Sequence, residues 1–166
     1  MPIKVGDRVV HPRHGLGRVT KLAIKRFGEG GKRLFYEISF PGSTLWVPLT
    51  LSTSGIRKLS AKSEIASCRR TLKAPAEPLN NDPRLRQTEL VDHLKEGTVT
   101  AHCEVVRDLT AHSWHKTLSG GIATLLNATR DVLCQEWAAV EGTTLSEAAS
   151  EIESLLEKGR PAENNE

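Results

Sequence analysis

Six histidines are the residues of this chain best suited to hold a metal ion or to move a proton. His112 and His115 have the spacing of one helical face, but no acidic or cysteine partner stands at the spacing of a zinc site. We therefore interpret this pair as part of a solvated polar face. His11 and His14 flank a turn in a basic segment, where we expect a structural hydrogen bond rather than catalysis.

The glycine-rich run Gly28 to Gly31 is superficially similar to a phosphate-binding loop, but it lacks the Gly-Lys-Ser/Thr ending and the following helix. We predict a hairpin turn there. The cysteines are odd in number and form no Cys-x-x-Cys pair, so we interpret them as reduced core residues: Cys68, Cys103 and Cys134. Nucleophile-elbow, HExxH and EF-hand patterns are also absent. We expect a protein that is not an enzyme, with no metal and no cofactor.

The charge is divided between the two halves of the chain. Residues 1–60 contain 11 Lys or Arg against 3 Asp or Glu, whereas residues 61–166 contain 12 against 17. The first half is therefore suited to an acidic partner, either nucleic acid or an acidic protein face. The alternative is a basic charge that only keeps a small barrel soluble. Because no apolar run approaches the ~20 residues of a spanning helix and no export signal is evident, we expect a cytoplasmic protein with no membrane contact.

The elements that would position these groups fall into two kinds. Residues 1–60 contain short runs of strand-forming residues between glycine turns, at positions 8–11, 17–27, 33–40, 44–48 and 56–57. Strands at this spacing predict a small antiparallel β-barrel. Tyr36, Ile38 and Phe40 fall on one face by the two-residue period, so we expect them in its core.

After residue 60 the apolar residues follow helical spacing, which predicts a bundle of about five helices. The first spans residues 63–72, and the others start near Pro83, after Thr98, at Ser119 and after Thr144. In the second helix we expect Leu90, Val91 and Leu94 to point inward, and in the fourth we expect Trp137 in the core. The fold class is thus α+β, with a barrel domain at 1–60, a helical domain at 61–159 and a disordered tail at 160–166.

Basic side chains of the helical half concentrate in one stretch of sequence, at Arg69, Arg70, Lys73, Arg84 and Arg86. These residues are suited to contact phosphates without reading bases. The alternative is an ordinary solvated helix face.

The sequence resembles the CarD/CdnL family of bacterial transcription regulators from Lys4 to about Leu156. The resemblance is carried by the motifs at residues 4–15, 45–48, 55–57, 72–75 and 104–109, and by the helix from 118 onward. The amino-terminal motif is shared with the polymerase-interacting module of transcription-repair coupling factors, and the helical half narrows the resemblance to CarD.

This resemblance implies a Tudor-like barrel, related to SH3 barrels, that binds the β subunit of RNA polymerase. Carried onto this sequence, the polymerase contacts fall on Lys25 and on the strand Leu45-Trp46-Val47. The resemblance also implies a helical domain that contacts promoter DNA without sequence-specific recognition and stabilises the open complex. We expect a monomer that associates with the nucleoid through the polymerase.

One departure from the family concerns the second helix. Family members carry a tryptophan at its start that wedges against opened base pairs, and here that position is Pro83. No Phe, Trp or Tyr occurs between Trp46 and Trp114. The expected DNA-binding residues are therefore Pro83, Arg84, Arg86, Arg69 and Lys73. The alternative function is a polymerase-docking adaptor that has lost the DNA-wedge activity.

Overall fold

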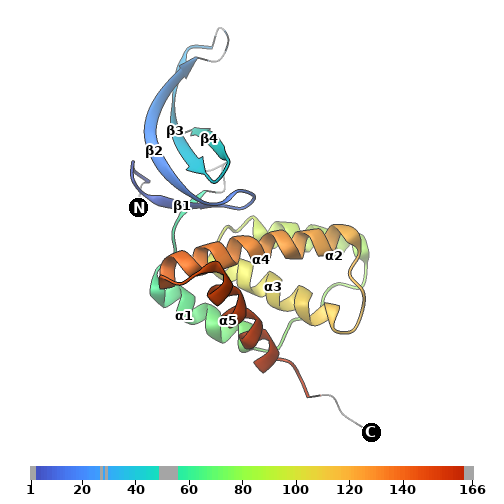
Figure 1. Ribbon diagram of the computed structural model, residues 1–166. Coiled ribbons are helices and arrows are strands. Elements are labelled where there is room, and N and C mark those ends of the chain that lie inside the picture. Colours follow the sequence, from blue (N-terminus) through green and yellow to red (C-terminus); the bar gives the residue numbers. More distant parts are fainter. Residues whose placement is uncertain (1–2, 27, 29, 49–55, 163–166) are drawn as a thin grey trace. The chain divides into compact units, whose positions relative to one another are not determined.

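The computed structural model describes residues 3–26, 28, 30–48 and 56–162. Contacts within the chain divide it into two compact units, Met1–Leu59 and Ser60–Glu166. Within the described residues, the first unit is a five-stranded antiparallel sheet and the second is built of five helices (Figure 1). The predicted α+β class is confirmed. The last four residues of the predicted disordered tail, 163–166, lie outside the described residues.

The sheet has the order β4-β3-β2-β1-β5, in which every neighbouring pair is antiparallel. Its strands are β1 (Arg8–His11), β2 (Gly15–Arg26), β3 (Lys32–Phe40), β4 (Ser43–Pro48) and β5 (Arg57–Lys58). The register of β2 on β3 shifts between Val19 and Lys21, and Figure 1 shows β2 as a strongly bent ribbon. Such an irregularity increases local twist and bends the strand. The predicted strand end at Phe27 lies outside the described residues.

The predicted β-barrel is not closed in the described residues, where the sheet is open. Closure would require β4 to pair with β5. Instead β4 pairs with β3, and β5 is a two-residue strand that pairs with β1 through Val9 and Val10. A two-residue strand has too few main-chain groups to pair with both β1 and β4. One edge of β4 therefore pairs with no other described strand.

The core of the sheet is formed by the predicted alternating residues. Tyr36, Ile38 and Phe40 are buried, and the Tyr36 hydroxyl donates a hydrogen bond to the Ile3 carbonyl at 2.7 Å. A Cβ atom on Gly17 would lie 2.6 Å from the Phe40 ring, so only glycine allows β2 to approach that ring. The two-residue period therefore identified the core face correctly.

His11 has the structural role expected from its position beside a turn. Its Nδ1 atom accepts hydrogen bonds from the Arg13 and His14 backbone N–H groups at 3.0 and 3.2 Å. Burial and the neighbouring charges of His14 and Arg13 lower the pKa of His11, which favours the neutral ring that can accept these bonds.

The helices begin and end close to the predicted positions. They are α1 (Lys62–Lys73), α2 (Pro83–Leu94), α3 (Val99–Ser113), α4 (Gly120–Glu141) and α5 (Leu145–Lys158). The side chains of Asp82, Thr98 and Thr144 cap α2, α3 and α5, and Gly142 ends α4 in the left-handed region. Helix α3 packs on α1 and α4, α5 packs on the same two helices, and α2 packs on α3.

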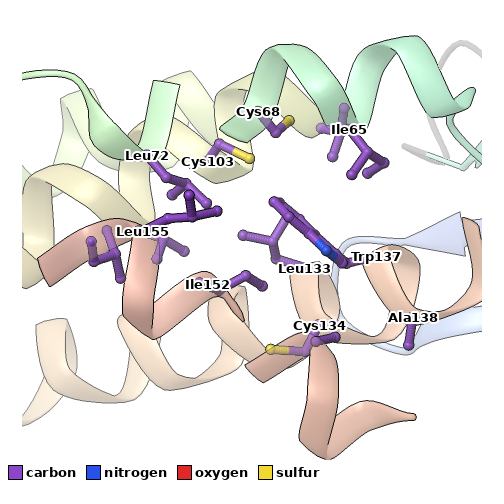
Figure 2. Packing of buried hydrophobic residues seen from close by; sticks show 14 residues of the cluster. Ile65, Cys68, Leu72, Cys103, Leu133, Cys134, Trp137, Ala138, Ile152 and Leu155 are labelled. Carbon is purple, nitrogen blue, oxygen red and sulfur yellow. The ribbon is translucent and has the colours of Figure 1, made fainter. Parts of the chain in front are cut away.

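Trp137 is the centre of the largest core cluster of the helical unit, as predicted. Its side chain is 0% exposed and lies among Ile65, Leu133 and Ile152 from three helices (Figure 2). The guanidinium of Arg69 lies 5.2 Å from the centroid of the indole. The three cysteines are free and buried, so their predicted place in the core is confirmed.

Glu136 is a buried carboxylate that ties the start of the helical unit to α4. Its Oε2 atom accepts hydrogen bonds from the Ser60 backbone N–H at 2.9 Å and from the Ser60 hydroxyl at 2.7 Å. Glu136 is 0% exposed, so these donors replace part of its hydration. The chain is thereby fixed immediately before α1.

The prediction that Val91 points inward is wrong. Leu90 is buried and Leu94 is partly buried, whereas Val91 is 37% exposed. Helix α2 packs mainly on α3, so it buries only a narrow stripe, and its apolar residues outside that stripe remain in contact with solvent.

Candidate functional site

The first candidate surface is the edge strand β4, which holds three predicted polymerase contacts. Leu45 and Val47 lie opposite Ile38 and Tyr36 and pack toward the core of the sheet. Trp46 lies opposite Glu37 on the other face and is 43% exposed. A partner on this edge would therefore meet the main chain of all three residues but only the indole among their side chains.

The fourth predicted polymerase contact, Lys25, lies in β2 opposite Arg33, and its side chain is outside the described part of the structure. Near it lies an apolar patch that was not predicted from the sequence, made of Leu22, Ile24 and Leu34, which are 50%, 65% and 49% exposed. Ile24 and Leu34 are directly paired across the two strands. These apolar residues alternate with polar ones in the sequence, and such an alternation predicts a face that is buried in the core rather than an exposed patch. The hairpin of β2 and β3 extends beyond the core that would cover them.

The second candidate surface is the first turn of α2. Asp82 Oδ1 accepts hydrogen bonds from the backbone N–H groups of Arg84 and Leu85 at 2.9 and 3.5 Å, and Pro83 occupies the first helical position. Pro83 and Arg84 are exposed, and Leu85, which is not among the predicted DNA contacts, is 52% exposed. This turn thus presents two apolar side chains next to a basic one.

Arg86 extends this surface toward α3. The Arg86 Nε atom donates a hydrogen bond to the Asn80 carbonyl at 2.9 Å, which holds the loop against the helix. Burial lowers the pKa of His112, and the positive charges of Arg86, Lys116 and His115 lower it further. Basic groups from α2 and from the end of α3 therefore lie near one another.

The structure separates Arg69 from this group of basic side chains. Arg69 forms ion pairs with Glu141 at 3.4 Å and with Glu151, and the Glu151 carboxylate together with Glu141 raises the pKa of the guanidinium. The guanidinium of Arg69 is thus already in contact with two carboxylates and with the indole of Trp137. Lys73, the last residue of α1, is exposed. The structure thus brings Pro83, Arg84 and Arg86 together on one helix and directs Arg69 toward the core.

The described residues contain no group of three or more His, Cys, Asp and Glu that could hold a metal ion. Burial raises the pKa of the Cys103 thiol well above its ordinary value and also raises that of Cys134, so both are poor nucleophiles at neutral pH. No described helix is both long and apolar enough to cross a membrane.

Comparisons with known proteins assign both units of the chain. A family model described as "CarD-like/TRCF RID domain" matches residues 3–60, and one described as "CarD, C-terminal domain" matches residues 68–153. The chain is similar to the Bacillus subtilis (strain 168) protein named "Putative transcription factor YdeB", with 25% identity over 144 residues that cover 85% of this chain and 94% of the relative. The chain therefore belongs to the CarD family of transcription regulators, whose amino-terminal domain interacts with RNA polymerase.

Proposed function

We propose that this protein binds the β subunit of RNA polymerase through strand β4 and contacts promoter DNA through the first turn of α2. In this proposal it modulates the stability of the open promoter complex without reading sequence and without catalysing a reaction. The observation that carries the proposal is the edge position of β4, with Trp46 exposed beside it.

Strand addition is the mode of docking that this edge supports. An extended segment of a partner can pair with an edge strand through main-chain hydrogen bonds, and side chains beside the edge then select the partner. The excess of basic over acidic residues in positions 1–60 favours an acidic partner surface. Trp46 is suited to anchor the contact, because exposed aromatic side chains often dominate interface energies.

The proposed DNA contact combines phosphate binding with an apolar tip. Arg84 and Arg86 are placed to meet phosphates, while Pro83 and Leu85 offer apolar side chains of the kind that lean on base steps in other architectural proteins. Neither has the stacking area of an indole. We therefore expect weak, sequence-indifferent binding, and Arg84→Ala/Arg86→Ala should reduce the slope of log affinity against log salt by about 1.8.

A two-component binding assay between the full chain and the purified β subunit tests the polymerase contact. The double variant Trp46→Ala/Lys25→Glu is expected to lower the affinity at least about tenfold, the loss of one strong interface contact. Leu145→Ala serves as the control, because Leu145 is a 57% exposed apolar residue of the helical unit. Equal affinity of the double variant and the wild type would show that the docking surface lies elsewhere.

A second candidate function is an adaptor that docks on the polymerase but does not hold DNA. The observation that favours it is the proline at the start of α2, where the family carries its wedge tryptophan. Titration of forked promoter DNA with the full chain separates the two functions. Salt-dependent binding that weakens in Arg84→Ala/Arg86→Ala supports the DNA-contacting regulator, whereas no binding at low salt supports the adaptor.

A further inference from the structure

A pocket of about 440 Å³ lies within the helical unit, between the segment 74–81, the end of α3 and the residues that follow α5. Its volume is within the range of about 300–1,000 Å³ that is common for sites that bind small organic groups. Leu72, Leu79 and Leu156 contribute apolar wall, and Trp114 contributes a half-buried indole. The walls are therefore suited to a flat, weakly polar ring.

The indole of Trp114 is held in place before any ligand arrives. The guanidinium of Arg160 lies 4.7 Å from the centroid of the ring. Gly159 makes this possible, since a Cβ atom there would lie 2.7 Å from the Lys73 carbonyl oxygen. Only glycine lets the chain after α5 pass so close to the end of α1, and the next residue, Arg160, then covers one face of the indole.

Cationic side chains gather around the rim of the pocket. Lys116 lines it together with His112 and His115, Arg160 lies over the indole, and Arg86 lies close enough to His112 to lower the pKa of that ring. These cations come from α2, from the residues just after α3 and from those after α5, so the positive potential has contributions from three segments.

The acidic residues of the same pocket offset this charge only in part. Glu77 and Asp108 line it with Arg107. Asp108 Oδ1 accepts hydrogen bonds from Arg107 Nε at 2.8 Å and from the Glu77 backbone N–H at 3.0 Å, so this carboxylate is already matched by a cation. An anionic group on the ligand would thus meet the ammonium group of Lys116 at the rim.

A ring that carries an anionic phosphate is the chemistry of a nucleotide. We propose that this pocket receives an unpaired nucleotide of a DNA strand, with the base against Trp114 and its phosphate beside Lys116. The proposal rests on the DNA contact proposed above. Asn80, which accepts a hydrogen bond from Arg86, directly precedes the pocket residue Asn81, so the first turn of α2 and the pocket belong to one continuous surface.

The test compares two DNA molecules of equal length, one fully paired and one with a short single-stranded flap, by fluorescence anisotropy with the full chain. Trp114→Ala is expected to weaken flap binding roughly 5- to 150-fold, the effect of losing one stacked base, and to leave duplex binding unchanged. Trp114→Phe, which keeps a ring, should retain most of the affinity and guards against a folding defect. Leu145→Ala, at an exposed apolar residue of the helical unit, is the control.

A 2-aminopurine base in the flap gives an independent reading, because stacking on an indole quenches its fluorescence. Quenching by the wild type that is lost in Trp114→Ala supports the proposal. Equal flap affinity in wild type and Trp114→Ala, with duplex binding intact, overturns the pocket proposal alone. Failure to bind either DNA overturns the proposed DNA contact as well. If dAMP binds as tightly as the flap and with the same dependence on Trp114, the pocket serves free nucleotides and the strand assignment is wrong.

Discussion

Replacing Trp137 with alanine tests the packing of the helical unit. The side chain is 0% exposed, and truncation of a buried aromatic residue costs about 3–5 kcal/mol. Part of that loss is the cation–π contact with Arg69, which in other proteins contributes about 0.5–2 kcal/mol. At about 4 °C per kcal/mol for a domain of roughly 100 residues, the melting temperature of the helices should fall by about 12–20 °C.

The assay is thermal unfolding followed by the helical circular dichroism signal. Trp46→Ala provides a control of the same residue type, because Trp46 is 43% exposed and its removal should cost less than about 1 kcal/mol. Among the described residues, the buried Trp137 Nε1 atom has no hydrogen-bond partner, so Trp137→Phe should lower the stability clearly less than Trp137→Ala does. A melting temperature for Trp137→Ala within a few degrees of the wild type would refute the assigned core.

Three further predictions follow from the same unit. Glu136→Ala should destabilise the helical unit by about 1.5–3 kcal/mol, because Ser60 loses a charged acceptor; unchanged denaturant unfolding would contradict this. Cys103 and Cys134 have raised pKa values, so iodoacetamide should modify them only after unfolding, and rapid labelling of the native protein would count against their burial. The pKa of His112 is lowered from 6.5 in the free protein, and a bound phosphate would raise it. DNA binding should then take up a proton, so the affinity should rise as the pH falls toward the lowered pKa of the free protein, and a pH-independent affinity would disprove this.

Local signals in the sequence were sufficient to place the helices. The side chains of Asp82, Thr98 and Thr144 accept hydrogen bonds from backbone N–H groups in the first turns of their helices. Pro83, at the first helical position, has no N–H group to satisfy. Each signal and its effect therefore lie within a few residues of each other. The alternation of buried and more exposed residues that begins at Tyr36 is an equally local signal. The α+β class and the core faces followed from these patterns.

Features that depend on contacts between distant segments did not follow from the sequence. The open sheet depends on which strand β5 pairs with, and the exposure of Ile24 depends on how far the hairpin extends beyond its core. Arg69 was grouped with other basic residues by position, yet Glu151, far along the chain, holds its guanidinium. The pocket beside Trp114 likewise forms only where three separate segments meet.

The lifetime of the open promoter complex, measured with the cognate RNA polymerase and a competitor that traps released enzyme, tests the proposed function most directly. We expect the wild-type protein to change this lifetime, Trp46→Ala/Lys25→Glu to abolish the effect, and Arg84→Ala/Arg86→Ala to reduce it most at moderate salt. A lifetime that the wild type leaves unchanged, or an effect that survives both double variants, would contradict the assignment of these two surfaces.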